Sequence, residues 1–419
     1  MELGRRQVLA GGAMGAVGIA AGVALGRATA SDAGPAVSEE PSATVAFRGE
    51  RQAGIETAPQ RHVALASFDV VDRDRAGVRD LLGEWTDLGE ALCAGRAVAN
   101  DTGEATGLGS ARLTVTFGFG ASFFDDECAP RSARPARLVD LPAFPGDALE
   151  DVWNGGDLVV QVCADDPTIV SHAVRQLRRI GSGRVASRWM QNGFLSQVPG
   201  QTSRNLFGQV DGTANPAPGS PEFDELVWAR AGDGPDWMTG GTFMAVRRIR
   251  MNLTMWDRMG LDVQEGAVGR QRESGAPLTG GDEFTPLDLD AERDGEPVIA
   301  PDAHVRVAKA AGPGMLRRGY SFDNGPRPTN APTVEIPTEM DHAQHDQMDH
   351  APLGAAMDDH DAGLLFIAFV RDPATQFVPM QQALSDSDAL GHFLVYTSAS
   401  LWAVPPGTRT GAIAAALDA

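Results

Sequence analysis

"DLVVQVCADDPTIVSHAVRQL", residues 157–177, contains a strand, a helix and the boundary between them. Its first ten residues have the composition of a strand. Asp166 and Pro167 then form a helix start, because Asp caps free backbone N–H groups and Pro fits the first helical position. Apolar residues follow at helical spacing, at Val170, Ala173, Val174 and Leu177. This stretch therefore predicts an α+β arrangement in which a strand runs directly into a helix.

Three segments before this stretch fit the same arrangement. Residues 61–70 have the composition of a strand, and apolar residues recur at helical spacing within residues 72–95. Residues 111–120 alternate strictly, which predicts a strand with Leu113, Val115 and Phe117 on one face. The first half of the chain is thus expected to contain strands separated by two helices.

The second half repeats this order of elements. Strands are predicted at residues 240–251, 363–372 and 401–406, with helices at residues 252–260 and 376–386. Two such halves predict two α+β units built on antiparallel sheets, and 419 residues suffice for two domains or one large one. The connections at 260–300 and 323–362 are long, and connections of that length are usually functional or disordered.

The first 30 residues have the pattern of an export signal. Arg5 and Arg6 precede a Gly/Ala-rich apolar run, and a small-x-small cleavage site ends at Ala30. The paired arginines favour the twin-arginine route, and hence an extracellular, cell-envelope or periplasmic location. An uncleaved membrane anchor is the alternative, although the apolar run is short for a span. Residues 31–45 are polar and contain proline, which predicts a linker.

The charge of the chain bounds its partners. Its formal net charge is −21, and removing residues 1–30 makes it more negative by two, because three arginines and one glutamate are lost. Such an acidic chain is not expected to bind nucleic acid or anionic membranes. The three cysteines, Cys93, Cys128 and Cys163, allow at most one disulfide, and their spacing matches no zinc or redox motif.

Two further stretches carry residues suited to chemistry. "RNLFGQVDGTANP", residues 204–216, places Asp211 between two glycines, and alone it predicts only an Asp-Gly turn. "DAHVRVAKAAGPGMLRRGYSFDNG", residues 302–325, contains an isolated His304 in what we expect to be a short apolar strand, followed by Arg317. A lone histidine of this kind is usually a hydrogen-bonded core residue.

Together these stretches resemble the dye-decolorizing (DyP-type) haem peroxidases, and in particular their exported EfeB-like deferrochelatase/peroxidase branch. The resemblance covers nearly the whole chain after the linker, apart from residues 326–361. Besides 204–216 and 302–325, it rests on 49–60, 141–147, 155–167, 188–194, 237–251 and 264–278.

The resemblance implies a fold of two ferredoxin-like units with antiparallel sheets, of the dimeric α/β-barrel type. Residues 46–200 would form the N-terminal unit and residues 201–419 the C-terminal unit, which would bind haem b. It also implies an enzyme that reduces hydrogen peroxide through a ferryl intermediate and oxidises dye-like or phenolic donors, either small or docked at the surface. Release of iron from haem and non-catalytic carriage of haem or copper are the alternatives. The oligomeric state stays open.

The resemblance also assigns residues. His304 would be the proximal ligand of the haem iron, with Asp386 or Asp388 as its carboxylate partner. Asp211 would be the distal acid/base and Arg317 the distal arginine. Gly212, Thr213 and Ala214 would line the haem beside Asp211. Other expectations concern aromatic residues: Tyr320 would be either a buried structural residue or a radical carrier, and core packing is expected of Trp237, Trp256 and Trp402.

The insert at residues 326–361 lies outside the resemblance. It is rich in Pro, acidic residues, His and Met and lacks a regular apolar face, which predicts a surface loop. Thioether and imidazole ligands together suit copper. The candidate copper ligands are Met340, His342, His345, Met348, His350, Met357 and His360. A solvated acidic loop without a ligand is the alternative.

Overall fold

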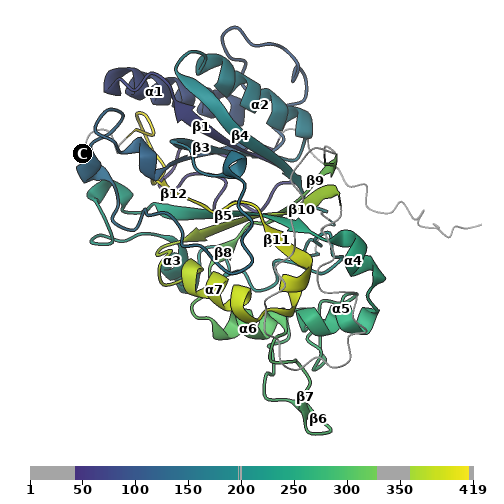
Figure 1. Cartoon of the computed structure of the whole chain (residues 1–419). Coiled ribbons are helices and arrows are strands. Elements are labelled where there is room, and N and C mark those ends of the chain that lie inside the picture. The colour runs from purple at the N-terminus through teal and green to yellow at the C-terminus, as the bar shows by residue number, and fades with distance from the viewer. Residues whose placement is uncertain (1–42, 197, 199–200, 328–358, 415–419) are drawn as a thin grey trace, which may run out of the picture. The chain divides into compact units, whose positions relative to one another are not determined.

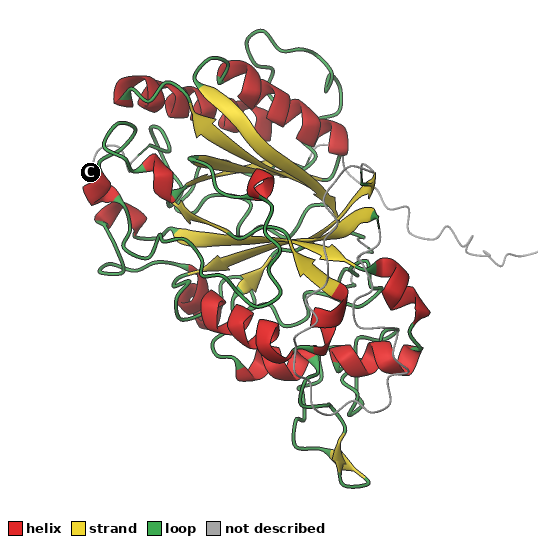
Figure 2. Ribbon diagram, viewed as in Figure 1, coloured by secondary structure: helices red, strands yellow, loops and turns green. Residues whose placement is uncertain are grey.

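The computed structural model describes residues 43–196, 198, 201–327 and 359–414 (Figure 2). The predicted signal at 1–30, the linker up to residue 42 and most of the insert lie outside the described residues. The described residues belong to one compact unit, which begins at Pro41.

The first half of this unit is a ferredoxin-like β-α-β-β-α-β arrangement. Its elements are β1 (His62–Val70), α1 (Arg75–Cys93), β2 (Thr114–Phe119), β3 (Leu158–Ala164), α2 (Pro167–Ile180) and β4 (Val185–Phe194). All its strand pairs are antiparallel, in the order β2-β3-β1-β4. The predicted helix start is confirmed, because Asp166 caps α2 by accepting hydrogen bonds from the backbone N–H groups of Thr168 and Ile169.

The second half repeats this order with additional short elements. Its strands are β5 (Thr242–Met251), β8 (Leu316–Arg317), β9 (Tyr320–Pro326), β10 (His360–Val370), β11 (Leu394–Tyr396) and β12 (Ser400–Val404). Its helices are α3 (Pro221–Val227), α4 (Leu253–Arg258), α5 (Leu261–Val268), α6 (His304–Ala310) and α7 (Phe377–Ser387). A separate two-stranded ribbon consists of β6 (Glu292–Arg293) and β7 (Glu296–Pro297).

The two sheets join edge to edge into a closed ring of strands. β12 meets β2 at the pair Ala403 and Phe119, and β4 meets β9 at the pair Phe194 and Ser321. Within the second half, β5 pairs with β10, and this pairing completes the ring. Helices α1 and α2 cover one side of the ring, and α4 to α7 lie on the opposite side (Figure 1). The predicted α+β class with antiparallel sheets is confirmed.

The strands are buried on both faces, which explains their nearly continuous apolar sequences. On β1, Val63 and Leu65 pack into the interior of the ring, whereas Ala64 and Phe68 pack beneath α1 and α2. The strand around Leu113 was predicted to have one buried face, but every residue of β2 is buried. Alternation detects the apolar face, which packs beneath α1, and it cannot reveal that the opposite face is enclosed in the interior of the ring.

Two expectations about the core are tested by the structure. Trp237, Trp256 and Trp402 are buried, as predicted. The three cysteines are buried and free, so the single disulfide that the sequence allowed does not form. Among the described residues, no helix combines the length and the apolar composition that a membrane span requires.

The prediction of a strand around His304 is wrong. His304 is the first residue of helix α6, which continues to Ala310. The alternation His-Val-Arg-Val suggested a strand, but the following Ala-Lys-Ala are strong helix formers and Val307 is the only buried residue of the helix. At this short length, local propensity and packing outweigh an apparent period of two.

The two ends of the insert are also more regular than a surface loop. Pro326 ends β9 and His360 begins β10, and these two residues pair in the antiparallel ladder. The backbone N–H of Arg327 donates to the carbonyl of Asp359 at 2.6 Å. The insert therefore joins two neighbouring strands of the ring, and its described ends belong to the sheet.

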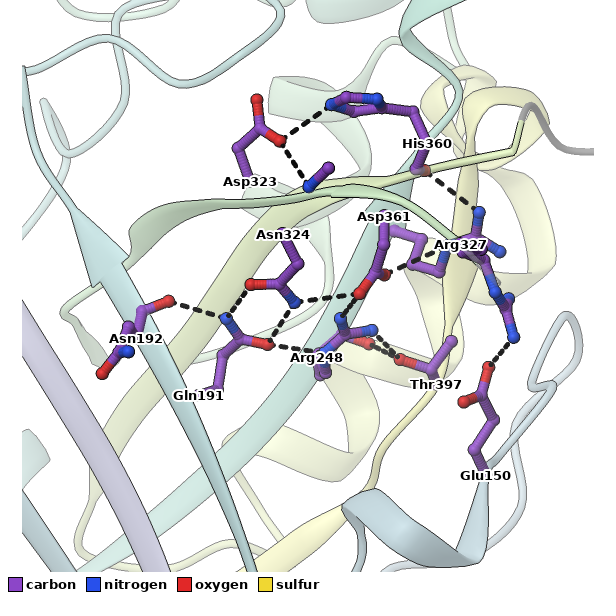
Figure 3. A network of polar contacts seen from close by, with 12 residues as sticks. Glu150, Gln191, Asn192, Arg248, Asp323, Asn324, Arg327, His360, Asp361 and Thr397 are labelled. Carbon is purple, nitrogen blue, oxygen red and sulfur yellow. Dashed lines mark hydrogen bonds and ion pairs between the residues drawn. The ribbon is translucent and has the colours of Figure 1, made fainter. Parts of the chain in front are cut away.

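A polar network holds the strands together at the base of the insert (Figure 3). At its centre, the buried guanidinium of Arg248 on β5 donates to Asp361 at 2.6 Å and to Gln191 at 2.8 Å. Asn324 on β9 also donates to Asp361, at 2.9 Å. Burial raises the pKa of Asp361, but its hydrogen bond and charge interaction with Arg248 outweigh this and lower it. The carboxylate thus compensates a cation that is out of contact with water.

Replacing Asp361 by alanine should lower the free energy of unfolding by about 3 kcal/mol, near the lower end for breaking a buried pair. Arg248 would keep its hydrogen bonds to Gln191 and Thr397 but would lose its counter-charge. Denaturant unfolding would measure the change. Asp359→Ala is the matched control, since that exposed residue contributes only its backbone carbonyl nearby. Equal stability of the two variants would contradict the central role of Asp361.

Candidate active site

A cavity of about 460 Å³ lies where the two halves of the unit meet. Its volume is within the usual range of ligand pockets. Its lining includes Arg61, Arg112, Asp211, Gly212, Arg317 and Arg318. The first two come from the N-terminal half and the others from the C-terminal half, so neither half forms the cavity alone.

A hydrogen-bonded turn places Asp211 at this cavity. The backbone N–H of Asp211 donates to the carbonyl of Ser203 at 2.9 Å, and Asn205 Nδ2 donates to Asp211 Oδ2 at 3.4 Å. Gly212 follows with φ of +123°, a conformation that residues with a Cβ rarely adopt. A Cβ at Gly212 would also lie 3.4 Å from the Thr202 methyl group. The glycine thus lets the backbone turn sharply while the carboxylate still reaches the cavity.

Asn215 ties this turn to the strand that carries Arg317. Its side-chain amide donates to the Arg317 carbonyl at 2.7 Å, and its side-chain oxygen accepts from the Arg317 N–H at 2.9 Å. Arg317 Nη1 lies 3.8 Å from Asp211 Oδ1, and both side chains are about 30% exposed. The two groups therefore form a solvent-accessible pair of opposite charges whose backbones are held at a fixed separation.

His304 is oriented by a buried carboxylate. Its Nδ1 lies 2.6 Å from Asp388 Oδ2, and the Asp388 side chain is only 2% exposed. The other oxygen of Asp388 accepts from the backbone N–H of Leu390. The backbone N–H of Ala389 donates to the carbonyl of Asp302, which links the Asp388 segment to the start of α6. Asp386 instead accepts a hydrogen bond from Gln382, so Asp388 is the partner of the two that were predicted.

The charges of the site act on His304 together. Burial lowers the pKa of His304, but the charge of Asp388 and its hydrogen bond raise it above the ordinary value. Arg317 and Asp211 exert weaker and opposite effects on the same imidazole. The three residues that were separately predicted from the sequence are therefore close enough to interact electrostatically.

The residues present fit a haem group. With Nδ1 held by Asp388, the His304 side chain directs its remaining nitrogen, Nε2, away from this carboxylate, and no described residue hydrogen-bonds to it. A neutral imidazole fixed in this way is the usual axial ligand of a haem iron. The imidazole is 29% exposed, so the side chain is accessible to a group as large as a porphyrin.

Of the three other residues that were predicted to line the haem, one lines the cavity. Gly212 lines the cavity. Thr213 donates its hydroxyl to Glu283 at 2.9 Å, and Ala214 is exposed. Their contact with haem stays a prediction.

Two supporting residues were not identified from the sequence. Glu283 accepts hydrogen bonds from Thr213 and, at 2.5 Å, from Thr202, and so holds both ends of the Asp211 segment. It lies in the long 260–300 connection, where no pattern marks it. Asn215 stands inside the motif around Asp211, but its role depends on Arg317, 102 residues further along the chain.

Tyr320 is fully buried, which favours the structural role. Its hydroxyl donates to Cys163 Sγ at 3.6 Å, in the interior of the ring. Burial raises the pKa of Tyr320 well above its usual value.

Of the candidate copper ligands, the structure describes only His360. Its Nε2 lies 2.8 Å from Asp323 Oδ1, so this imidazole is held against the sheet (Figure 3). The other six, Met340, His342, His345, Met348, His350 and Met357, lie outside the described residues.

Comparison with protein families gives two matches. A family described as "Dyp-type peroxidase, N-terminal" matches residues 52–195, and one described as "Dyp-type peroxidase, C-terminal" matches residues 202–409. Together they span both halves of the ring and include Asp211, His304 and Arg317.

Similar proteins carry two kinds of name. A dye-decolorizing peroxidase of Thermobifida fusca is 36% identical, over 96% of this chain and 94% of that protein. A deferrochelatase of Shigella flexneri is 30% identical, over 97% of this chain and 94% of that protein. Among solved structures, ferric DtpA from Streptomyces lividans superimposes with a TM-score of 0.79 at 35% identity, covering 90% of this chain and 98% of that one.

Proposed function

Because the chain belongs to the Dyp-type peroxidase family, we propose that it is an exported haem b enzyme that reduces hydrogen peroxide and oxidises dye-like or phenolic donors. The peroxidase class follows from the family, whereas export and the donor class are supported by the sequence alone. The observation that carries the proposal is the pairing of Asp211 with Arg317 at 3.8 Å, together with His304 held by Asp388.

Each residue has a distinct role in this proposal. Haem, when bound, supplies an iron that accepts oxidising equivalents from hydrogen peroxide and passes them on to a donor. His304 would bind the iron through Nε2, and Asp388 would make that nitrogen more basic by accepting a hydrogen bond from the N–H at Nδ1. Asp211 would take a proton from hydrogen peroxide and return it to the departing oxygen. Arg317 would stabilise the negative charge that develops as the O–O bond breaks.

The proposals of export and of copper binding rest on the sequence alone. The paired arginines of residues 1–30 support twin-arginine export without a lasting membrane anchor, which N-terminal sequencing of the secreted protein would check. The His and Met content of the insert supports copper binding. If deletion of residues 340–360 left the affinity for copper unchanged, copper binding by the insert would be contradicted. Binding of nucleic acid is not proposed.

Rapid mixing tests the central activity. When the purified ferric protein is mixed with one equivalent of hydrogen peroxide, its haem absorption spectrum should change during the recording. A phenolic donor added afterwards should restore the ferric spectrum. Haem carriage without catalysis would leave the spectrum unchanged, and that outcome would contradict the proposal.

Iron release is the second candidate, because the Shigella flexneri relative is named a deferrochelatase. The same preparation, incubated with haem under anaerobic reducing conditions, would then yield chelatable iron and intact fluorescent protoporphyrin. Absence of both products would exclude this activity under those conditions.

A further inference from the structure

A cluster of side chains that could bind a metal ion lies in the N-terminal half, outside the cavity that contains Asp211. It consists of Asp101 and Glu104, in the connection between α1 and β2, and His172 on α2. One ligand atom from each residue lies within 4.8 Å of those from the other two. None of these residues lines the cavity that contains Asp211.

The imidazole of His172 is the central element of this cluster. Its side chain is 6% exposed, and its Nδ1 and Nε2 lie 3.2 Å from Glu104 Oε1 and 3.5 Å from Asp101 Oδ2. Despite this proximity, neither His172 Nδ1 nor Glu104 Oε1 forms a hydrogen bond, although both atoms are buried. Buried polar atoms are rarely left unsatisfied.

Two arrangements could satisfy these atoms. A protonated imidazole between two carboxylates would hydrogen-bond to both, but the geometry at Nδ1 does not meet that requirement. A cation between the three residues would instead accept one lone pair from each. One ligand atom from each of the three residues lies within 4.8 Å of the other two, which is close enough for a single ion to contact all three.

We propose that Asp101, Glu104 and His172 bind one divalent metal ion. One imidazole nitrogen with two carboxylate oxygens is a ligand set that suits zinc, with water in the remaining position. The imidazole argues against calcium and magnesium, which prefer all-oxygen ligands.

Surrounding hydrogen bonds hold the two carboxylates in place. Asp101 Oδ1 accepts from the Gly103 N–H at 2.8 Å, which leaves Oδ2 facing His172. The Thr102 hydroxyl hydrogen-bonds to Glu104 Oε2, and Gln176 on α2 in turn donates to this hydroxyl at 2.7 Å. Such outer contacts are typical of metal sites.

Arg175 is the competitor for this site. Its Nη1 lies 3.0 Å from Glu104 Oε1, the same atom that faces His172, and its side chain is 54% exposed. A metal ion would displace this guanidinium into solvent, which its exposure permits. A hollow lined by Thr102, Arg175, Arg178 and Arg179 lies beside the cluster and has room for the displaced guanidinium.

Isothermal titration of the haem-loaded full chain with zinc chloride tests the proposal. His172→Gln and Glu104→Gln should each remove one equivalent of bound zinc relative to the parent chain, whatever the insert binds. Arg175→Gln should strengthen binding at that equivalent, because it removes the competing cation. Saturating zinc should raise Tm by about 2–5 °C in the parent chain and less in His172→Gln.

Three outcomes would overturn the proposal. The parent chain and both ligand variants could bind equal numbers of zinc ions, or neither the parent chain nor Arg175→Gln could bind zinc at this equivalent. Calcium could also bind more tightly than zinc. Haem content and circular dichroism of each variant would verify its fold, and Glu104→Gln provides the result if His172→Gln does not fold.

Discussion

Replacement of Asp211 by asparagine should slow the reaction with hydrogen peroxide by about 10²–10⁴-fold, the usual contribution of a general acid–base group. The substitution preserves the shape of the side chain, and Asn205 and Arg317 would still lie beside it. Asparagine cannot accept the peroxide proton and return it, so the loss would fall on proton transfer. Stopped-flow measurement of the second-order rate constant against peroxide concentration would show the effect.

The control for this variant is Asp257→Asn, which changes an exposed carboxylate on α4 to the same amide. Its rate constant should equal that of the parent chain. Arg317→Leu should also slow the peroxide step, because the developing charge would lose its cation. If Asp211→Asn reacts at the parental rate, Asp211 is not the proton acceptor, and another group lining the cavity must be sought.

Replacement of His304 by alanine should abolish stable haem binding. The imidazole is the only iron ligand that we assign to the chain, and Asp388 would be left as a buried carboxylate without its partner. The haem-to-protein ratio after gel filtration, read from the absorption spectrum, would fall to near zero. Addition of imidazole to this variant should restore part of the haem binding, since the free base can occupy the vacated position.

His62→Ala is the matched control, because His62 lies on β1 in the N-terminal half, outside the half that we expect to bind haem. It should retain a full complement of haem. Circular dichroism of His304→Ala would establish that the polypeptide still folds. Full haem retention by a folded His304→Ala protein would show that another residue binds the iron.

Local signals predicted the regular elements well. The Asp166-Pro167 boundary lies at the observed start of α2, because capping and the fixed φ of proline act within a few residues. His304 shows the limit of such signals. Four alternating residues suggested a strand, whereas the backbone forms the first turn of α6. A pattern of that length cannot distinguish the two states.

Contacts between residues far apart in the sequence could not be predicted from local sequence patterns. Choosing Asp388 over Asp386 required the position of each carboxylate relative to His304, more than 80 residues away in sequence. The bond of Glu283 to Thr213 likewise joins two irregular segments that carry no periodicity. The resemblance between whole motifs supplied Asp211, His304 and Arg317, since it compares complete arrangements and not single elements.

The repeated strand order has a consequence for symmetry. The two halves of the ring are related to each other as two subunits of a dimer would be, yet they are connected in one polypeptide. A ring assembled from two identical chains would contain two equivalent sites. Here the His304–Asp388 pair belongs to the second half, and the first half supplies different residues. Its arginines, Arg61 and Arg112, instead contribute to the wall of the single cavity.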